Sequence, residues 1–267
     1  MLYYVDNKNF TLANHTIVLL HGFCENSGIW QEFDIESADK PRIICIDLPN
    51  FGKSPALLNT THTHEISIEN MADAVHELLQ HLEISDCAMF GHSLGGYVTL
   101  AFADKYPKML KGIGLINSSV YADSEEKKQN RNKLIESLET YGTKPFLSTF
   151  FENLFYEKNL PKFEKELAWL QDEAQNLTTE TLIQTTKAMR DRKDYTALLQ
   201  NLDIPVLFIV GKQDTILPYE LHKEQFLLPK EATIQVGEEV GHLSMFEAKD
   251  QTFAAILNFS LCCYDKV

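Results

Sequence analysis

Three residues that lie far apart in this chain of 267 residues have side chains that together could carry out acyl transfer: Ser93, Asp214 and His242. A serine hydroxyl is a weak nucleophile until a histidine takes its proton. That histidine needs a carboxylate, which holds the imidazole in the correct tautomer and stabilises the imidazolium. These residue types predict a Ser–His–Asp catalytic triad, provided that the fold brings them together.

The surroundings of Ser93 favour this role. Residues 91–95 have the sequence Gly-His-Ser-Leu-Gly, which fits the Gly-x-Ser-x-Gly pattern of a nucleophile elbow, a strained turn that exposes the serine. An apolar strand is expected over 87–90 before the turn, and a helix over 95–105 after it. We therefore expect Ser93 to be the nucleophile, and His92 to pack in the elbow rather than transfer protons.

The other two candidates also follow predicted strands. Asp214 comes after the apolar run 205–210, and His242 comes after 232–236. The carboxyl ends of parallel strands meet at one edge of an α/β sheet, where ligands bind. Asp191 and Asp203 are weaker candidates for the acid, because neither of them closes a strand.

Strands and helices alternate along most of the chain, which predicts an α/β fold with a mostly parallel central sheet flanked by helices. Helices are expected over 68–82, where Ser67 is a candidate N-cap, and over 250–261. The expected strands are 2–5, 10–13, 16–20, 42–46, 87–90, 112–116, 205–210 and 232–236.

The pattern changes between residues 119 and 195, where charged helical segments are expected over 125–140, 162–175 and 179–192. We interpret 119–195 as a helical cap inserted after the sixth strand, with 1–118 and 196–267 forming the core. Phe146 and Phe150 are candidate substrate-binding residues, although cap aromatics often form the cap's own core. Arg190 is the candidate for binding a substrate carboxylate, with Arg131 and Arg192 as alternatives, although exposed arginines are ordinary.

Composition excludes several classes of partner. The net charge of −14 opposes binding to nucleic acid or to an anionic membrane. The five cysteines are odd in number and form no Cys-x-x-Cys pair, and no signal peptide is evident, so we expect a cytoplasmic protein. His62 and His64 have no further ligand at metal-binding spacing, so no metal is expected. The expected partner is a small-molecule ester, and the expected state is a monomer or homodimer.

Acyl transfer also requires hydrogen-bond donors for the oxyanion. The backbone N–H of Leu94 lies at a helix start, where amide groups are unpaired. The second donor should come from the loop after strand 16–20, so we expect the backbone N–H of Phe23 to supply it.

Five ordered motifs together resemble the α/β-hydrolase superfamily over nearly the whole chain, and most of all its small serine esterases with a helical cap. They are His-Gly-Phe at 21–23, Asp-Leu-Pro-Asn-Phe-Gly-Lys-Ser at 47–54, Gly-His-Ser-Leu-Gly-Gly at 91–96, Gly-Lys-Gln-Asp at 211–214 and Gly-His at 241–242. The resemblance implies a cofactor-free enzyme in which Ser93, Asp214 and His242 form the triad, and Phe23 and Leu94 form the oxyanion hole.

Departures from subfamily patterns narrow the expected activity. Serine at position 93 disfavours haloalkane dehalogenases and epoxide hydrolases, which use aspartate. Carbon–carbon bond hydrolases usually carry a tryptophan shortly after the triad histidine, and residues 243–246 contain none. We predict a serine hydrolase, similar to carboxylesterases, that cleaves small or medium, largely apolar esters. The alternatives are a carbon–carbon bond or thioester hydrolase of a carboxylated substrate, and a ligand-sensing signalling hydrolase that acts through a partner.

Overall fold

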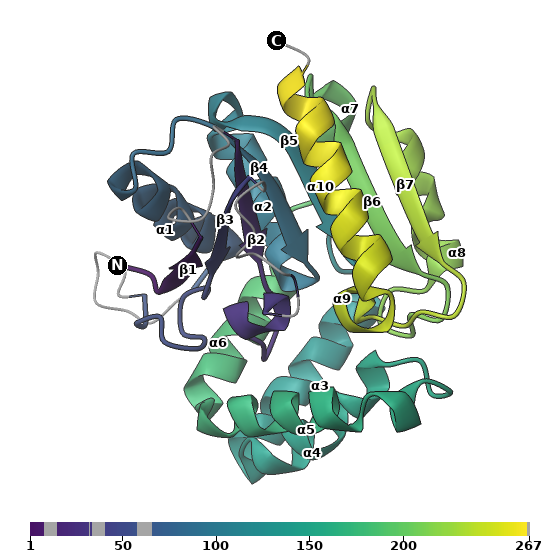
Figure 1. Cartoon of the computed structure of the whole chain (residues 1–267). Helices are drawn as coiled ribbons and strands as arrows, with labels where there is room; N and C mark the ends of the chain where they lie inside the picture. The colour runs from purple at the N-terminus through teal and green to yellow at the C-terminus, as the bar shows by residue number, and fades with distance from the viewer. Residues whose placement is uncertain (8–14, 32, 34–40, 58–65, 266–267) are drawn as a thin grey trace.

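The computed structural model describes residues 1–7, 15–31, 33, 41–57 and 66–265. Its centre is a seven-stranded sheet with the order β1-β3-β2-β4-β5-β6-β7 (Figure 1). β1 pairs with β3 in the antiparallel sense, and all other pairs are parallel. The strands are β1 (Tyr4–Asp6), β2 (Thr16–Leu20), β3 (Arg42–Ile46), β4 (Cys87–His92), β5 (Leu110–Ile116), β6 (Val206–Gly211) and β7 (Ala232–Gly237).

Helices cover both faces of this sheet. α10 (Lys249–Asp265) crosses in front of β5 and β6 in Figure 1, and α2 (Leu94–Lys105) packs against β4 and β5 from behind. α1 (Ile68–His81) packs against α2. Every residue of β2, β4 and β6 is buried, which explains why these strands are continuous apolar runs rather than alternating ones. The mostly parallel central sheet flanked by helices that the sequence predicted is therefore confirmed.

Local sequence signals account for the helix boundaries. The Ser67 side chain accepts a hydrogen bond from the Asn70 amide, so it caps α1 as expected. Apolar residues at helical spacing form the buried side of α1: Ile68, Met71, Ala72, Ala74, Val75, Leu78 and Leu79.

The chain between β5 and the short helix α7 (Thr196–Asn201) is helical, and lies beneath the sheet in Figure 1. It contains α3 (Glu125–Tyr141), α4 (Lys144–Phe150), α5 (Glu164–Glu173) and α6 (Thr179–Arg190), with 3₁₀ turns at Glu152–Leu154, Leu160–Lys162 and Ala174–Asn176. We call residues 119–195 the cap. The cap follows β5 here, whereas the sequence prediction counted a further strand at 10–13, which lies outside the described residues.

The remaining helices are short. They are α8 (Tyr219–His222), α9 (Ser244–Glu247) and 3₁₀ turns at Ser27–Trp30, Pro107–Met109 and Lys223–Leu227. In the described part of the chain, no helix has the length and apolar character needed to cross a bilayer.

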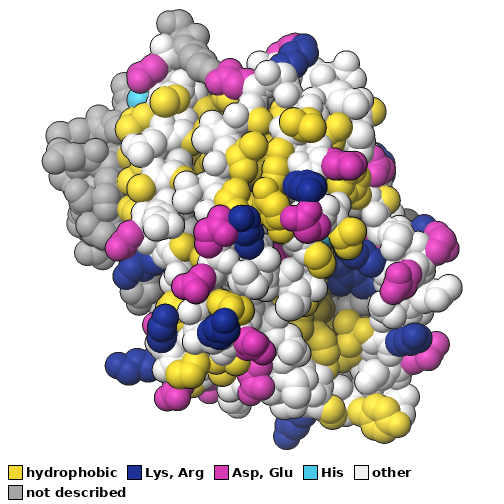
Figure 2. Space-filling view, turned by 90° about the vertical axis from the view of Figure 1, so that its right-hand side faces the viewer, with side chains coloured by type: hydrophobic (Ala, Val, Ile, Leu, Met, Phe, Trp, Pro, Cys, Tyr) yellow, Lys and Arg dark blue, Asp and Glu magenta, His cyan; other side chains and the backbone are white. Residues whose placement is uncertain are grey.

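The sheet ends at β7, on the side of the molecule that Figure 2 shows. Hydrophobic side chains gather in the middle of this face, among interspersed acidic and basic ones. Ile234 of β7 is 46% exposed, so the last strand is only partly covered, unlike the central strands. The cysteines are all free thiols; burial raises the pKa of Cys45 and of Cys87 inside their strands.

Candidate active site

Ser93 lies on a sharp turn between β4 and α2. Its backbone has φ 48° and ψ −110°, outside the regions that side-chain-bearing residues ordinarily adopt. The Ser93 amide donates to the Ile116 carbonyl at 2.9 Å, which ties the turn to the end of β5. A Cβ at Gly91 would overlap the backbone of Gly95, so glycine is required where the strand and helix meet. This geometry is that of the nucleophile elbow.

His242 and Asp214 are hydrogen-bonded to each other below this turn. His242 Nδ1 lies 2.7 Å from Asp214 Oδ2, and both side chains are almost fully buried. Asp214 Oδ1 accepts from the amides of Ile216 and Leu217, each at 2.9 Å. Asn117 donates to Asp214 Oδ2 at 3.1 Å. The carboxylate is thus surrounded by donors that hold its orientation toward the histidine.

The electrostatics of this pair favour an ionised acid. Burial alone would raise the pKa of Asp214, but His242 and the hydrogen bonds from Leu217 and Asn117 hold it below its usual range. An ionised Asp214 can only accept hydrogen bonds, so His242 Nδ1 carries the proton and Nε2 is free to accept one.

The expected oxyanion donors lie at the ends of neighbouring elements. Phe23 follows β2, and Leu94 is the first residue of α2. Neither amide donates a hydrogen bond within the described part of the chain. Both amides are therefore available to a substrate oxygen. The elements that carry them lie close together, because a Cβ at Gly95 in α2 would lie 2.6 Å from the Leu20 carbonyl oxygen at the end of β2.

A small cavity of about 50 Å³ holds Ser93 and His242. The core contributes Phe23 to its lining, and the cap contributes Arg131, Phe150, Leu154 and Met189. The cap thus closes over the serine with an apolar surface and one cation.

Of the three cap residues predicted to bind substrate, only one lines this cavity. Phe150 lines this cavity and its ring centroid lies 5.8 Å from that of Phe23. Phe146 does not line it, but packs on Phe150 with ring centroids 4.8 Å apart. Arg190 is turned away: its guanidinium binds Asp191 and the Asn132 side chain.

Of the two alternatives to Arg190, Arg131 lines the cavity and Arg192 does not. The Nε of Arg131 donates to Asp123 at 3.1 Å. Asp123 also pairs with Arg192 at 2.7 Å, so a single carboxylate serves two guanidinium groups. Arg192 in turn lies over the Tyr97 ring, 4.0 Å from its centroid. Arg131 therefore brings a positive charge to the cavity lining, whereas Asp123 and Arg192 do not line the cavity.

Sequence reasoning missed two residues that support the site. Asn117, which has φ 45°, donates to both Asp214 and the Gly241 carbonyl, and it follows β5 at the sheet edge where ligand-binding residues gather. Glu25 accepts from His92 Nδ1 at 2.9 Å. The available signal for Glu25 was its place two residues after His-Gly-Phe, in the loop expected to supply an oxyanion donor. His92 does not simply pack, because both its ring nitrogens are hydrogen-bonded.

The loop that carries His242 is tied to the cap through Glu247. One Glu247 oxygen accepts from the Gly241 amide at 2.8 Å, and the other accepts from the Tyr156 amide at 2.9 Å. The His242 amide donates to the Leu154 carbonyl at 2.7 Å. Burial raises the pKa of Glu247. These contacts fix the position of the histidine relative to the cap.

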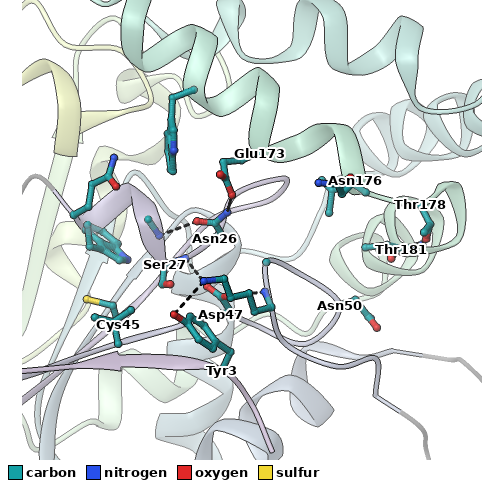
Figure 3. A pocket seen from close by; sticks show the side chains of 18 of the residues that line it. Tyr3, Asn26, Ser27, Cys45, Asp47, Asn50, Glu173, Asn176, Thr178 and Thr181 are labelled. Atoms are coloured by element: carbon teal, nitrogen blue, oxygen red, sulfur yellow. Dashed lines mark hydrogen bonds between the residues drawn. The ribbon is translucent and has the colours of Figure 1, made fainter.

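A larger cavity of about 780 Å³ lies beside this site, between the core and α5 and α6 (Figure 3). Several of its polar groups are hydrogen-bonded to one another: Asp47 accepts from the amides of Ser27 and Lys53, and Asn26 donates to Glu173 at 2.7 Å. It contains neither Ser93 nor His242. We therefore place the active site in the smaller cavity.

Metal binding is not indicated within the described ranges, where no three His, Cys, Asp or Glu side chains are grouped to hold an ion. His62 and His64, which the sequence analysis considered, lie outside those ranges.

Comparison with known proteins agrees with this architecture. The family model described as alpha/beta hydrolase fold matches residues 15–249. The chain belongs to the α/β-hydrolase family.

Individual relatives show the range of activities within that family. A thermophilic esterase from Thermogutta terrifontis is 27% identical, with a TM-score of 0.88 over 98% of this chain and 93% of that one. Lipase 1 of Psychrobacter immobilis is 25% identical over 93% of this chain and 77% of its own length. A 2-hydroxy-6-oxononadienedioate/2-hydroxy-6-oxononatrienedioate hydrolase of a Pseudomonas species is 24% identical over 92% of this chain and 88% of its own length. The chain is thus a hydrolase of this family, similar to esterases, lipases and carbon–carbon bond hydrolases.

Proposed function

We propose that this protein is a serine hydrolase that cleaves carboxylic esters through an acyl-enzyme. The observation that carries the proposal is the hydrogen bond of 2.7 Å between His242 Nδ1 and Asp214 Oδ2, beside Ser93 on its strained turn. Ser93 and His242 line one cavity. The likeness to the Thermogutta esterase supports the same reaction class.

In the first half of the reaction, Ser93 Oγ attacks the ester carbonyl carbon while His242 Nε2 takes the hydroxyl proton. The carbonyl oxygen becomes negatively charged and accepts hydrogen bonds from the amides of Phe23 and Leu94, each worth roughly 3 kcal/mol in the transition state. The tetrahedral intermediate then collapses. The C–O bond to the alcohol breaks, and His242 gives its proton to the leaving alkoxide.

In the second half, a water molecule replaces the alcohol. His242 removes a proton from the water as it attacks the acyl carbon, and then returns that proton to Ser93 Oγ as the acid leaves. Asp214 remains ionised throughout and stabilises the imidazolium that forms in each half. The same two amides bind the oxyanion both times.

The cavity lining favours an apolar acyl or alcohol group of small or medium size. Phe23, Phe150, Leu154 and Met189 offer hydrophobic contacts to such a group. Apolar contacts of this kind contribute about 0.8 kcal/mol for each buried methylene.

A second candidate is a hydrolase of carboxylated substrates, and Arg131 is the observation that favours it. Arg131 lines the cavity, and only its Nε has a hydrogen-bond partner in the described residues. Its terminal nitrogens can donate to the two oxygens of a carboxylate as a bidentate fork. The relative from Pseudomonas is named as a hydrolase of dioates.

The test is turnover of p-nitrophenyl esters by the wild type and by Ser93→Ala. We expect the wild type to hydrolyse short and medium acyl chains and the variant to lose this activity. Equal turnover by both proteins would refute the serine mechanism.

The second candidate is tested with Arg131→Gln on the p-nitrophenyl monoester of succinic acid and on the neutral butyrate ester. A charge-assisted contact of about 1.5–3 kcal/mol predicts a loss of about 10- to 100-fold in kcat/KM for the monoester alone. Equal losses on both esters would exclude a carboxylate-binding role for Arg131.

A further inference from the structure

A buried ion pair lies beside the candidate nucleophile and takes no part in the steps above. The side chains of Glu25 and His92 are each 1% exposed, and Glu25 Oε2 lies 2.9 Å from His92 Nδ1. Replacing a buried ion pair with apolar residues often leaves stability unchanged or raises it, because removing two charges from water is costly. Stability alone therefore does not explain this pair.

The hydrogen bonds of His92 determine its charge. Its Nδ1 faces the Glu25 carboxylate, and its Nε2 lies 2.9 Å from the backbone carbonyl oxygen of His242. Both partners can only accept hydrogen bonds, so both ring nitrogens donate and the ring is an imidazolium.

The charged surroundings agree with this assignment. Burial alone would lower the pKa of His92, but the Glu25 carboxylate, the His242 backbone carbonyl and Asp214 together raise it. The other titratable groups around the ring are His21 from the end of β2, Asp214 from the loop after β6, and His242, whose ring centroid lies 5.0 Å away. Burial alone would raise the pKa of Glu25, but His92, His21 and the Gly22 amide together lower it, which favours the ionised carboxylate.

The pair joins three segments that supply the reacting groups. Glu25 Oε2 also accepts from the Gly22 amide at 2.6 Å, one residue before the Phe23 amide. His92 directly precedes Ser93 and holds the backbone of His242. A Cβ at Gly22 would lie 2.7 Å from both Glu25 Oε2 and His92 Nδ1, so the segments are packed with no room for a side chain between them.

Building on the esterase function proposed above, we propose that Glu25 and the His92 imidazolium are positioning residues that hold the oxyanion loop and the His242 backbone in place around Ser93. A neutral imidazole donates only one hydrogen bond, so deprotonation of His92 breaks its contact with either Glu25 or His242. Full activity therefore requires His92 to be charged.

Glu25→Gln removes the negative charge of this pair but keeps the shape of the side chain. Oε1 of Glu25 has no hydrogen-bond partner in the described residues, so the amide NH₂ can take its place while the amide oxygen keeps the contacts of Oε2. Without the carboxylate, the pKa of His92 falls. We expect the alkaline limb of kcat to move to lower pH by about 1–3 units, with KM little changed.

Two further variants define the comparison. Glu25→Ala also removes the acceptor, so kcat should fall by about 100-fold at every pH, as for misplaced catalytic groups. Asp6→Asn is the matched control, because Asp6 forms a partly buried ion pair with Arg42 at 2.7 Å at the edge strand β1, and neither residue lines the cavity. Its pH profile should match that of the wild type.

The charge of His92 is measured separately by ¹⁵N NMR of its ring, where we expect both nitrogens to be protonated at neutral pH. A neutral ring in the wild type would overturn the proposal. A Glu25→Gln variant with a lower melting temperature but the kcat and pH profile of the wild type would also overturn it. A wild-type protein that hydrolyses no ester but has a doubly protonated His92 would refute the proposed esterase function. It would not contradict the assignment of Glu25 and His92 as an ion pair.

Discussion

Replacing Asp214 with asparagine should invert the hydrogen bonding of His242 without changing the shape of the site. In the wild type, Asp214 Oδ1 accepts from two backbone amides, Ile216 and Leu217, and Oδ2 accepts from His242 Nδ1. The asparagine oxygen must face the two backbone amides, so its NH₂ faces His242. The imidazole then has to accept at Nδ1 and carry its proton on Nε2, where it cannot take the proton of Ser93.

The size of the effect follows from the tautomer. A triad held in the wrong tautomer loses about 10⁴-fold in kcat. This loss corresponds to about 5.4 kcal/mol of transition-state stabilisation, because each factor of ten is 1.36 kcal/mol. Asn117 adds to the effect, since its NH₂ group donates to Asp214 Oδ2 and would meet another donor in the variant.

The assay is steady-state hydrolysis of p-nitrophenyl acetate or butyrate by Asp214→Asn, with the melting temperature measured alongside. Asp203→Asn is the matched control, because Asp203 pairs with Lys230 on the surface and does not line the cavity. We expect KM to change little in both proteins and kcat to fall only in Asp214→Asn. A folded Asp214→Asn variant with kcat within a factor of about ten of the wild type would refute the tautomer argument.

Three further outcomes follow from the same structure. Gly91→Ala should lower the free energy of unfolding by about 1–3 kcal/mol in urea melts, because its Cβ would overlap the Gly95 backbone; an unchanged midpoint would contradict the elbow packing. The pKa of Glu25 lies below its ordinary 4.5, so its stabilising contribution is present above that value and disappears as pH falls through the folded-state pKa. The melting temperature should therefore drop on acidification, and less steeply in Glu25→Gln; parallel curves would argue against an ionised Glu25. Phe150→Ala should lower kcat/KM for long acyl chains by about 10- to 100-fold, since burying an aromatic side chain is worth about 1.5–3 kcal/mol, and should spare acetate. Phe146 does not line the cavity, so Phe146→Ala should lower kcat/KM less than Phe150→Ala does. A larger loss in Phe146→Ala would contradict the assignment of Phe150 to the acyl-binding site.

Most of the fold was predictable because its strands are buried on both faces. Residues 16–20 and 42–46 were expected as strands and form β2 and β3 with the same bounds. A continuous β-branched run between turn residues has few alternatives to a central parallel strand. The meeting of Ser93, Asp214 and His242 followed from topology, since parallel strands bring their carboxyl ends to one edge.

The contacts inside the site were less predictable, because they depend on side-chain direction rather than on pattern. Arg190 and Arg131 are both arginines on cap helices, and only packing turns the first toward Asp191 and the second toward the cavity. Glu25 and His92 are 67 residues apart, and nothing in their local sequences indicates that they pair. The two residues meet only because the fold brings together the loop after β2, the turn at Ser93 and the loop that carries His242.

The central claim is that Ser93 is an activated nucleophile, and covalent labelling tests it most directly. The protein is treated with a fluorophosphonate and digested, and the peptides are identified by mass spectrometry. We predict stoichiometric modification of Ser93 in the wild type, and strongly slowed modification in His242→Ala. Absence of label from Ser93 in the folded wild type, or equal labelling in His242→Ala, would contradict the account.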